Sequence, residues 1–341
     1  MKEQHEKRIV AQTIALCALC ATAAPSADAH HSRAAYDTTK EVMIEGVVAD
    51  VTWANPHVYF VLEVASPDGS KTMQQVEVGP LSTVGPLGLN RDVLVPGARV
   101  TVRGNPNRRG PGYTVVGLDM TIADGSIYPL HVFGRSRPPP AAQKADSLAG
   151  KWVPTTESWF ALTRDRDWPM TEVARRVNSD TASQLASQAQ CAPWPPPVLM
   201  GLPALLAIEV RPEIVTLRFD WMGAERTIYT NIERHPTNLA PSLLGHSIGH
   251  WEGATLVIDT VGFTPHREGA GFGIPSSERK HLTERLALSE DRTSVIYEFT
   301  VEDPFALTEP VTRSVKWSYR PDLEPSGQQC DPEIATRALR E

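Results

Sequence analysis

The sequence predicts a mainly β protein built from two successive barrels. We expect a small OB-like Greek-key barrel, followed by a larger antiparallel, lipocalin-like β-barrel that carries one helix. Three observations lead to this prediction. Short β-branched and aromatic runs with period-two alternation recur along the chain. The 29 prolines and 23 glycines interrupt the sequence too often for many long helices. A proline-rich segment separates the runs into two groups.

Composition limits the classes of protein that fit this chain. A length of 341 residues is long for one domain and sufficient for two. The hydrophobic share of 41% and the charged share of 21% are typical of a globular protein. The net charge of −7, without a basic patch, argues against nucleic acid as a partner.

The first 29 residues have the three parts of a signal peptide. A charged stretch at 1–8 precedes an apolar stretch at 9–24, and Ala27–Ala29 forms a small-x-small cleavage signal. The apolar stretch is short for a membrane span, and no other part of the chain approaches about 20 apolar residues. We therefore expect a periplasmic or secreted protein that begins at His30 and has no membrane span.

Residues 30–133 are expected to form the OB-like barrel. A polar arm precedes three strand-like runs, then a segment broken by glycine and proline that has room for one short helix, then two or three more runs. This order is typical of an OB-type barrel, and an open antiparallel sandwich is the alternative. The runs lie at 42–53, 57–65, 73–78, 98–104, 112–122 and 126–133. Residues 134–149, with three consecutive prolines, are expected to be a stiff linker.

Residues 150–341 are expected to form the second barrel. A helix is predicted over 171–190, with Thr171 as its N-cap and Glu172 in its first turn. After residue 203 the chain is almost entirely strand-like, which predicts an antiparallel barrel or a strongly curved sheet. The expected strands lie within 204–211, 213–221, 225–232, 280–288, 294–302 and 310–319, together with a central hairpin over 245–263.

Cysteine and histidine positions predict covalent and metal chemistry. Two cysteines remain after leader removal, Cys191 and Cys330, and in an exported protein such a pair predicts a disulfide. A free amine at His30, with His31 beside it and His57 nearby, would suit Cu(II). No other cofactor is expected.

The central hairpin carries two patterns that resemble known sites. His246 and His250 have metal-ligand spacing only on a helix, because four residues of strand span about 13 Å. The Gly245-x-Ser247-x-Gly249 pattern lacks the strand–turn–helix context of a hydrolase nucleophile. We therefore expect the hairpin to have a structural role.

Strand parity places two charged residues among apolar ones. Glu284 shares a face with the leucines of its strand, and Arg313 shares a face with Val311, Val315 and Trp317. If these faces point inward, each charge needs a partner inside the barrel. Two interpretations remain open. Glu284 and Arg313 form a structural ion pair, or they are polar groups that orient a ligand in an apolar cavity.

The leading functional hypothesis is binding of a small, partly apolar molecule in the second barrel. The expected ligand contacts are Arg313, Trp251, Trp317 and Tyr297. A second hypothesis is a cofactor-independent lyase or isomerase in which Glu284 acts as acid or base with a histidine, His281 if the register places it inward. Asp259 is a third candidate for an inward charged residue, after Glu284 and Arg313. A third is copper handling by His30 and His31.

Both halves also resemble known sequences. The N-terminal half resembles a bacterial family of exported proteins of unknown function, through His30-His31-Ser32, Tyr36-Asp37, Gly46-Val47, Trp53-Ala54-Asn55-Pro56-His57 and Leu94-Val95-Pro96-Gly97. The C-terminal half resembles a second set of uncharacterised exported proteins, through Gly245 to Gly253, Asp259 to Phe263 and Thr283-Glu284-Arg285. That set usually has Asp after Trp-Glu-Gly, where this chain has Ala254, so no catalytic role is expected there. Neither resemblance implies an activity.

Overall fold

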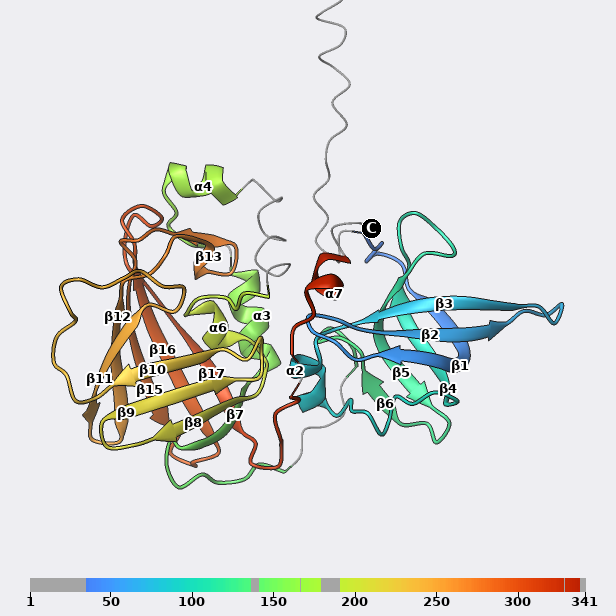
Figure 1. The fold of residues 1–341 in the computed structure, drawn as a ribbon, viewed down its shortest axis with the longest axis horizontal. Helices are drawn as coiled ribbons and strands as arrows, with labels where there is room; N and C mark the ends of the chain where they lie inside the picture. Colours follow the sequence, from blue (N-terminus) through green and yellow to red (C-terminus); the bar gives the residue numbers. More distant parts are fainter. Residues whose placement is uncertain (1–34, 136–140, 166, 179–190, 328, 338–341) are drawn as a thin grey trace, which may run out of the picture.

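The computed structural model describes residues 35–135, 141–165, 167–178, 191–327 and 329–337. Two β structures follow one another along the chain, as Figure 1 shows in blue to green and in green to orange. Among the helices of these residues, none is long and apolar enough to cross a membrane.

The first β structure is a small closed barrel. Its sheet has the order β3-β2-β1-β4-β5-β6, and β3 also pairs with β5, in parallel, which closes a ring of five strands. This strand order confirms the predicted OB-like barrel. The strands are β1 (Val42–Thr52), β2 (Val58–Ala65), β3 (Lys71–Val78), β4 (Arg99–Asn105), β5 (Val115–Ile122) and β6 (Ile127–Pro129). The expected helical insertion is α2 (Leu81–Val84) with the 3₁₀ turn η1 (Gly85–Leu87).

The second β structure is a larger closed barrel. Its nine strands follow the order β10-β11-β12-β15-β16-β17-β7-β8-β9, and β9 pairs with β10 to close the ring. They are β7 (Gly150–Pro154), β8 (Leu206–Val210), β9 (Ile214–Phe219), β10 (Glu225–Tyr229), β11 (His246–Glu252), β12 (Thr255–Val261), β15 (His281–Leu288), β16 (Ser294–Glu302) and β17 (Val311–Tyr319). A small hairpin of β13 (His266–Gly271) and β14 (Ile274–Ser276) lies outside this ring of strands.

Alternating apolar residues on these strands fill the barrel. On β15, for example, Leu282 and Leu286 are fully buried, whereas the residues between them are partly exposed, except for the inward Glu284. Their burial against the inner faces of the other strands builds one continuous apolar core.

One strand pair departs from the expected antiparallel order. β10 and β11 run parallel and share only two residue pairs, Ile228 with Ser247 and Tyr229 with Ile248. The other paired strands of the barrel, within the described chain, are antiparallel. Parallel neighbours cannot be joined by a tight turn, so residues 230–245 must carry the chain back to the starting end of β10.

Short helices lie beside the second barrel: α3 (Thr156–Arg164) and α6 (Val198–Gly201) are on the side of the first barrel, and a third helix is at the top in Figure 1. The predicted helix is observed as α4 (Glu172–Asn178), with Thr171 Oγ1 accepting from the backbone N–H of Ala174 at 3.1 Å. Residues 179–190 of that prediction lie outside the described chain. Three helices of the described chain were not predicted: α3, α6 and α7 (Pro332–Arg337).

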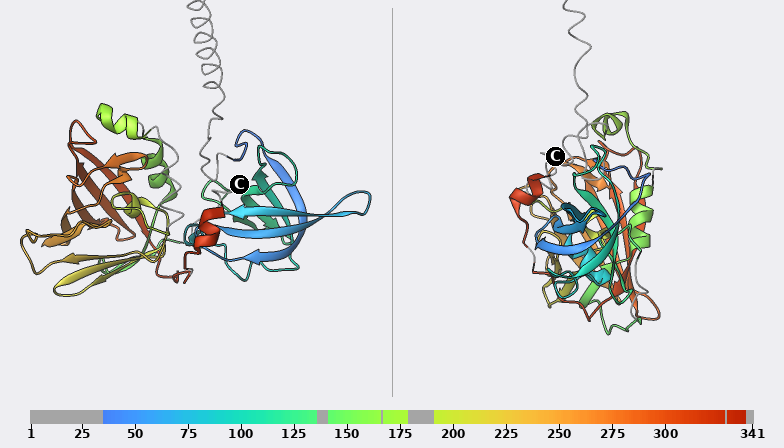
Figure 2. Two further views of the ribbon diagram at one scale, coloured as in Figure 1. Left: turned by 45° about the horizontal axis from the view of Figure 1, so that its top comes forward. Right: turned by 90° about the vertical axis from the view of Figure 1, so that its right-hand side faces the viewer.

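The C-terminal segment returns to the first barrel. Cys191 and Cys330 form the predicted disulfide, with their Cα atoms 5.7 Å apart. Cys330 also makes a β-bridge with Asn55, whose carbonyl accepts from the Asp331 N–H at 2.9 Å. The final helix, α7 (Pro332–Arg337), therefore lies beside the first barrel (Figure 2). The three consecutive prolines of the expected linker lie outside the described residues.

Candidate functional site

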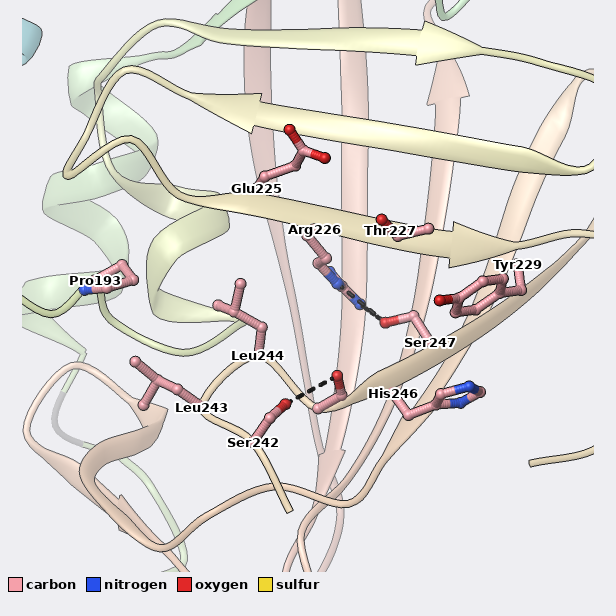
Figure 3. A pocket seen from close by; sticks show the side chains of 11 residues that line it. Pro193, Glu225, Arg226, Thr227, Tyr229, Ser242, Leu243, Leu244, His246 and Ser247 are labelled. Carbon is pink, nitrogen blue, oxygen red and sulfur yellow. Dashed lines mark hydrogen bonds between the residues drawn. The ribbon is translucent and has the colours of Figure 1, made fainter. Parts of the chain in front are cut away.

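A pocket of about 480 Å³ opens where β10 and β11 diverge. Arg226, Thr227 and Tyr229 of β10 line one side, and residues 242–247 line the other, with Pro193 at one end (Figure 3). The opening follows from the strand pairing. Glu225, Arg226 and Thr227 pair with β9, but within the described chain β11 pairs only with the last two residues of β10.

A buried ion pair lies beneath this pocket. Arg226 Nη1 donates to Glu284 Oε1 at 2.8 Å, and Nη2 donates to Oε2; the two side chains are 2% and 0% exposed. Arg226 Nε donates to Ser247 Oγ at 3.1 Å, and Nη2 also lies 3.0 Å from Ser247 Oγ and 2.9 Å from Thr260 Oγ1, its other acceptors. Tyr297 donates its hydroxyl to Glu284 Oε1 at 2.8 Å. The network satisfies both charged groups inside the barrel.

The protonation states of this network follow from its contacts. Burial alone would lower the pKa of Arg226, but the Glu284 carboxylate raises it above its ordinary value. Burial, with the Glu284 charge, raises the pKa of Tyr297 well above its usual value. Arg226 therefore stays charged, and Tyr297 stays protonated as a donor.

The predicted inward position of Glu284 is confirmed, but its predicted partner is wrong. Phe299 on β16 pairs with both Glu284 and Arg313, so two strand spacings, about 10 Å, separate the latter two. Arg226 instead reaches Glu284 across the barrel interior. Arg313 donates from Nε to Asp165 Oδ2 at 2.6 Å, outside the ion pair.

Asp259 and His281 lie on the outer face of the barrel, so the predicted inward position of Asp259 is wrong, and the register does not bring His281 inward beside Glu284. The neighbours Thr260 and Leu282 occupy the inner face and are fully buried. Apolar residues on both faces of β12 obscured the parity: Val257 is only 8% exposed although it points outward with Asp259. The wall of the barrel therefore separates both residues from Glu284.

Asp259 and His281 meet each other on this outer face. Asp259 Oδ2 bonds His281 Nε2 at 2.6 Å, and Oδ1 bonds His235 Nε2 at 2.7 Å. His235 Nδ1 lies 2.8 Å from Nδ1 of His246, which stacks on Tyr229 at the pocket. We call His235, His246, Asp259 and His281 the histidine cluster. His235 escaped prediction because it lies in a segment without strand or helix periodicity.

Contacts within the histidine cluster shift the pKa values of three of its members. Hydrogen bonding to His281 lowers the pKa of Asp259, and the same bond raises the pKa of His281. Burial, together with neighbouring His235, lowers the pKa of His246. The cluster thus favours an ionised Asp259, a charged His281 and a neutral His246.

The aromatic residues predicted to contact a ligand either fill the barrel or are exposed near the end of a hairpin. Trp317 and Tyr297 are fully buried and stack with ring centroids 5.3 Å apart. Trp317 also donates Nε1–H to the Met200 carbonyl at 3.0 Å. Trp251 is 41% exposed near the turn of the β11–β12 hairpin. None of the three lines the pocket between β10 and β11.

The proposed copper ligands are only partly described. His57 Nδ1 lies 3.3 Å from Glu77 Oε1, and Tyr36 donates its hydroxyl to the same buried carboxylate at 2.8 Å. His30 and His31 lie outside the described residues. Within the described part of the chain, no group of three or more His, Cys, Asp or Glu side chains has an arrangement that could hold a metal ion.

Strand parity could also have revealed a second buried charge. Lys280, just before β15, shares its face with Leu282 and Glu284 and is 1% exposed. Its Nζ donates to the carbonyls of Pro196 and Gly269 at 2.8 and 2.7 Å. Burial lowers the pKa of Lys280 well below its usual value. Lys280 ties the proline-rich segment to β13 and is not exposed for chemistry.

The fold and pocket define a two-barrel β protein with an opening in the wall of its second barrel. Residues 18–115 match a sequence family described as a family of unknown function, DUF6152. The match runs through β1 to β4 and reaches the first residue of β5, so it supports the expected resemblance of this half to an uncharacterised family. No curated protein matches the chain.

Proposed function

We propose that this protein binds a small, neutral, partly apolar molecule in the pocket between β10 and β11. The observation that carries the proposal is the pocket itself. Its volume of about 480 Å³ falls within the range of roughly 300–1,000 Å³ for small-molecule sites. Pro193, Leu243 and Leu244 supply apolar contacts, and Tyr229 supplies a hydroxyl.

Charge pairing around the pocket favours a neutral ligand. The Arg226 guanidinium is already matched by Glu284, so an anionic group would have to compete with a buried carboxylate. At the rim, Glu225 accepts from Arg218 Nε at 3.0 Å, which reduces its attraction for cations. Tyr229, an exposed residue at the end of β10, lines the pocket and offers one hydrogen-bonding group there (Figure 3).

This proposal moves the ligand from the barrel interior to the barrel wall. Trp317, Tyr297 and Phe299 fill the interior beside Glu284. The lyase or isomerase alternative has less support, because Glu284 is fully buried and the barrel wall separates it from His281. The leader-like residues 1–29 extend the proposal to an exported protein, which fractionation of expressing cells would test.

A thermal-shift screen tests the proposal directly. The library should contain neutral aromatic and aliphatic alcohols and ketones, with matched carboxylates and amines, and hits should be confirmed by calorimetry. We expect neutral compounds to raise the melting temperature and Leu244→Glu to weaken their binding at least tenfold. Ile296→Glu places the same charge at an exposed position on β16 and should leave binding unchanged. Equal binding by wild type and Leu244→Glu, or no neutral ligand, would refute the proposal.

A further inference from the structure

Residues 230–245, which we call the strap, join the parallel strands β10 and β11. Every residue of the strap is described and none of them is buried. Its partly buried apolar side chains, such as Leu239, give it only weak packing against the barrel. A segment with so little buried apolar surface depends on its polar contacts for order.

Those polar contacts are concentrated at one histidine. The ends of the strap are held by backbone bonds, from Thr230 N–H to the Glu213 carbonyl at 2.8 Å and from Ser242 N–H to the Gly262 carbonyl at 2.9 Å. Between them, in residues 231–241, His235 alone makes a hydrogen bond to the rest of the described chain. The middle of the strap is therefore anchored through the histidine cluster.

The protonation states of His235 and His246 decide whether the hydrogen bond between them can form. Asp259 is an acceptor, so His235 Nε2 must carry a proton to donate to it. The bond between His235 Nδ1 and His246 Nδ1 then needs one proton shared by two nitrogens, one donor and one acceptor. If both imidazoles are charged, both Nδ1 atoms carry a proton and the bond becomes a repulsion between like charges.

The carboxylate bonded to the pair is Asp259, which accepts from His235 Nε2 at 2.7 Å and is shared with His281. Asp259 on β12 already pairs with His281 on β15, whose other nearby charge is Glu302 on β16. On the side of β10 the neighbour of His246 is the neutral ring of Tyr229. The strap itself adds Glu233 and Arg234 next to His235, both exposed and of opposite charge.

We propose that the histidine cluster is an acid-released clamp, in which a second proton on the His235–His246 pair frees the strap and disturbs the pocket wall. The connection to the pocket is direct, because residues 242–245 of the strap and His246 itself line it. Only this effect on ligand affinity rests on the proposed function. Release of the strap concerns the unliganded protein.

The direction of the pH effect follows from His246. Burial and neighbouring His235 lower the pKa of His246 below the ordinary histidine value of 6.5, so the native pair resists its second proton. The clamp is intact above pH 6.5, and it opens as the pH falls from 6.5 through the lowered pKa of His246. The pKa of His281 is shifted in the opposite direction, because the hydrogen bond to Asp259 raises it. The His281–Asp259 contact is therefore strengthened, not lost, when His281 takes up a proton.

Hydrogen–deuterium exchange on the unliganded full chain tests the clamp. Protection of the strap at pH 7.5 and 5.0, corrected for the intrinsic rate, should fall at least tenfold at the lower pH, whereas β16 and β17 should keep their protection. In His235→Gln, strap protection should be low at both values. In His246→Asn, whose amide does not titrate, most of the pH response should disappear. His250→Gln, an exposed change on the same strand, should behave as wild type.

Two results would overturn the clamp: strap protection that is independent of pH in the wild type, or a pH response that survives in His246→Asn. Calorimetry with a ligand from the screen then gives a separate readout. If strap exchange responds as stated but ligand affinity is equal at both pH values, the clamp stands and the proposed site fails. If no ligand binds at either pH, exchange alone still decides the clamp.

Discussion

Arg226 and Glu284 meet inside the second barrel although 58 positions separate them in the sequence. They come from β10 and β15, which are not neighbours in the ring of strands, and their side chains are 2% and 0% exposed. Closure of the barrel brings them together. This contact keeps Arg226 charged beneath the pocket.

Removing one partner of this pair should be strongly destabilising. Glu284→Leu leaves a buried guanidinium without its carboxylate, and we expect a loss of about 3–5 kcal/mol in the free energy of unfolding. The double variant Arg226→Met/Glu284→Leu should recover most of it, because no unpaired charge remains. Urea unfolding measures both. A double variant as unstable as the single one would contradict this account. Glu252→Leu, which breaks the exposed Glu252–Arg285 pair, should cost at most about 1 kcal/mol.

Removing the disulfide should destabilise the protein through its unfolded state. Cys191 and Cys330 are 139 residues apart, so the bond closes a long loop. We expect the Cys191→Ser/Cys330→Ser variant to lose about 2–5 kcal/mol. A reducing agent should lower the melting temperature of the wild type towards that of the variant and leave the variant unchanged. Equal melting temperatures for both oxidised proteins would argue against this role.

Glu268 should make stability decrease with rising pH near neutrality. Burial raises the pKa of Glu268 from 4.5 to about 7. Between these values the native state binds more protons than the unfolded state, so this contribution is present at low pH and is lost as the pH rises towards 7. Glu268→Gln should therefore be more stable than the wild type at pH 8, by about 1–3 kcal/mol, with little difference at pH 4.5. Chemical denaturation at both values tests this, with exposed Glu278→Gln as the control.

Asp119 should stabilise the first barrel and the start of the linker. Burial alone would raise the pKa of Asp119, but hydrogen bonds from Arg135 and Arg103 lower it. Its contribution is therefore present above the ordinary value of 3.8 and is lost as the pH falls through the lowered one. Asp119→Ala should cost about 2–4 kcal/mol at pH 7 and leave Arg103 partly buried without this partner.

The control for Asp119 is an exposed ion pair on the same barrel. Glu45 and Arg99 join β1 and β4 at 3.2 Å, with side chains 64% and 67% exposed. Glu45→Ala should cost less than about 1 kcal/mol. Similar losses in Glu45→Ala and Asp119→Ala would show that burial does not strengthen the Asp119 contacts.

Strand parity predicted inward positions well where one face of a strand is clearly apolar. Glu284 alternates with partly exposed residues and shares its face with Leu282 and Leu286, so its direction was predictable. Asp259 was misplaced because apolar residues occupy both faces of β12. His235 was missed because a residue in an irregular segment has no periodic pattern to place it.

The sequence by itself determined the local structure: two groups of strands, the OB-like order of the first group, the disulfide pair and the inward orientation of the Glu284 side chain. These follow from alternation over a few residues and from residue chemistry. Only the tertiary structure decided which distant side chains meet. Ring closure brings Arg226 to Glu284, and the crossing of residues 230–245 brings His235 to Asp259. Such contacts depend on strand order and register across the whole barrel, which no local pattern encodes.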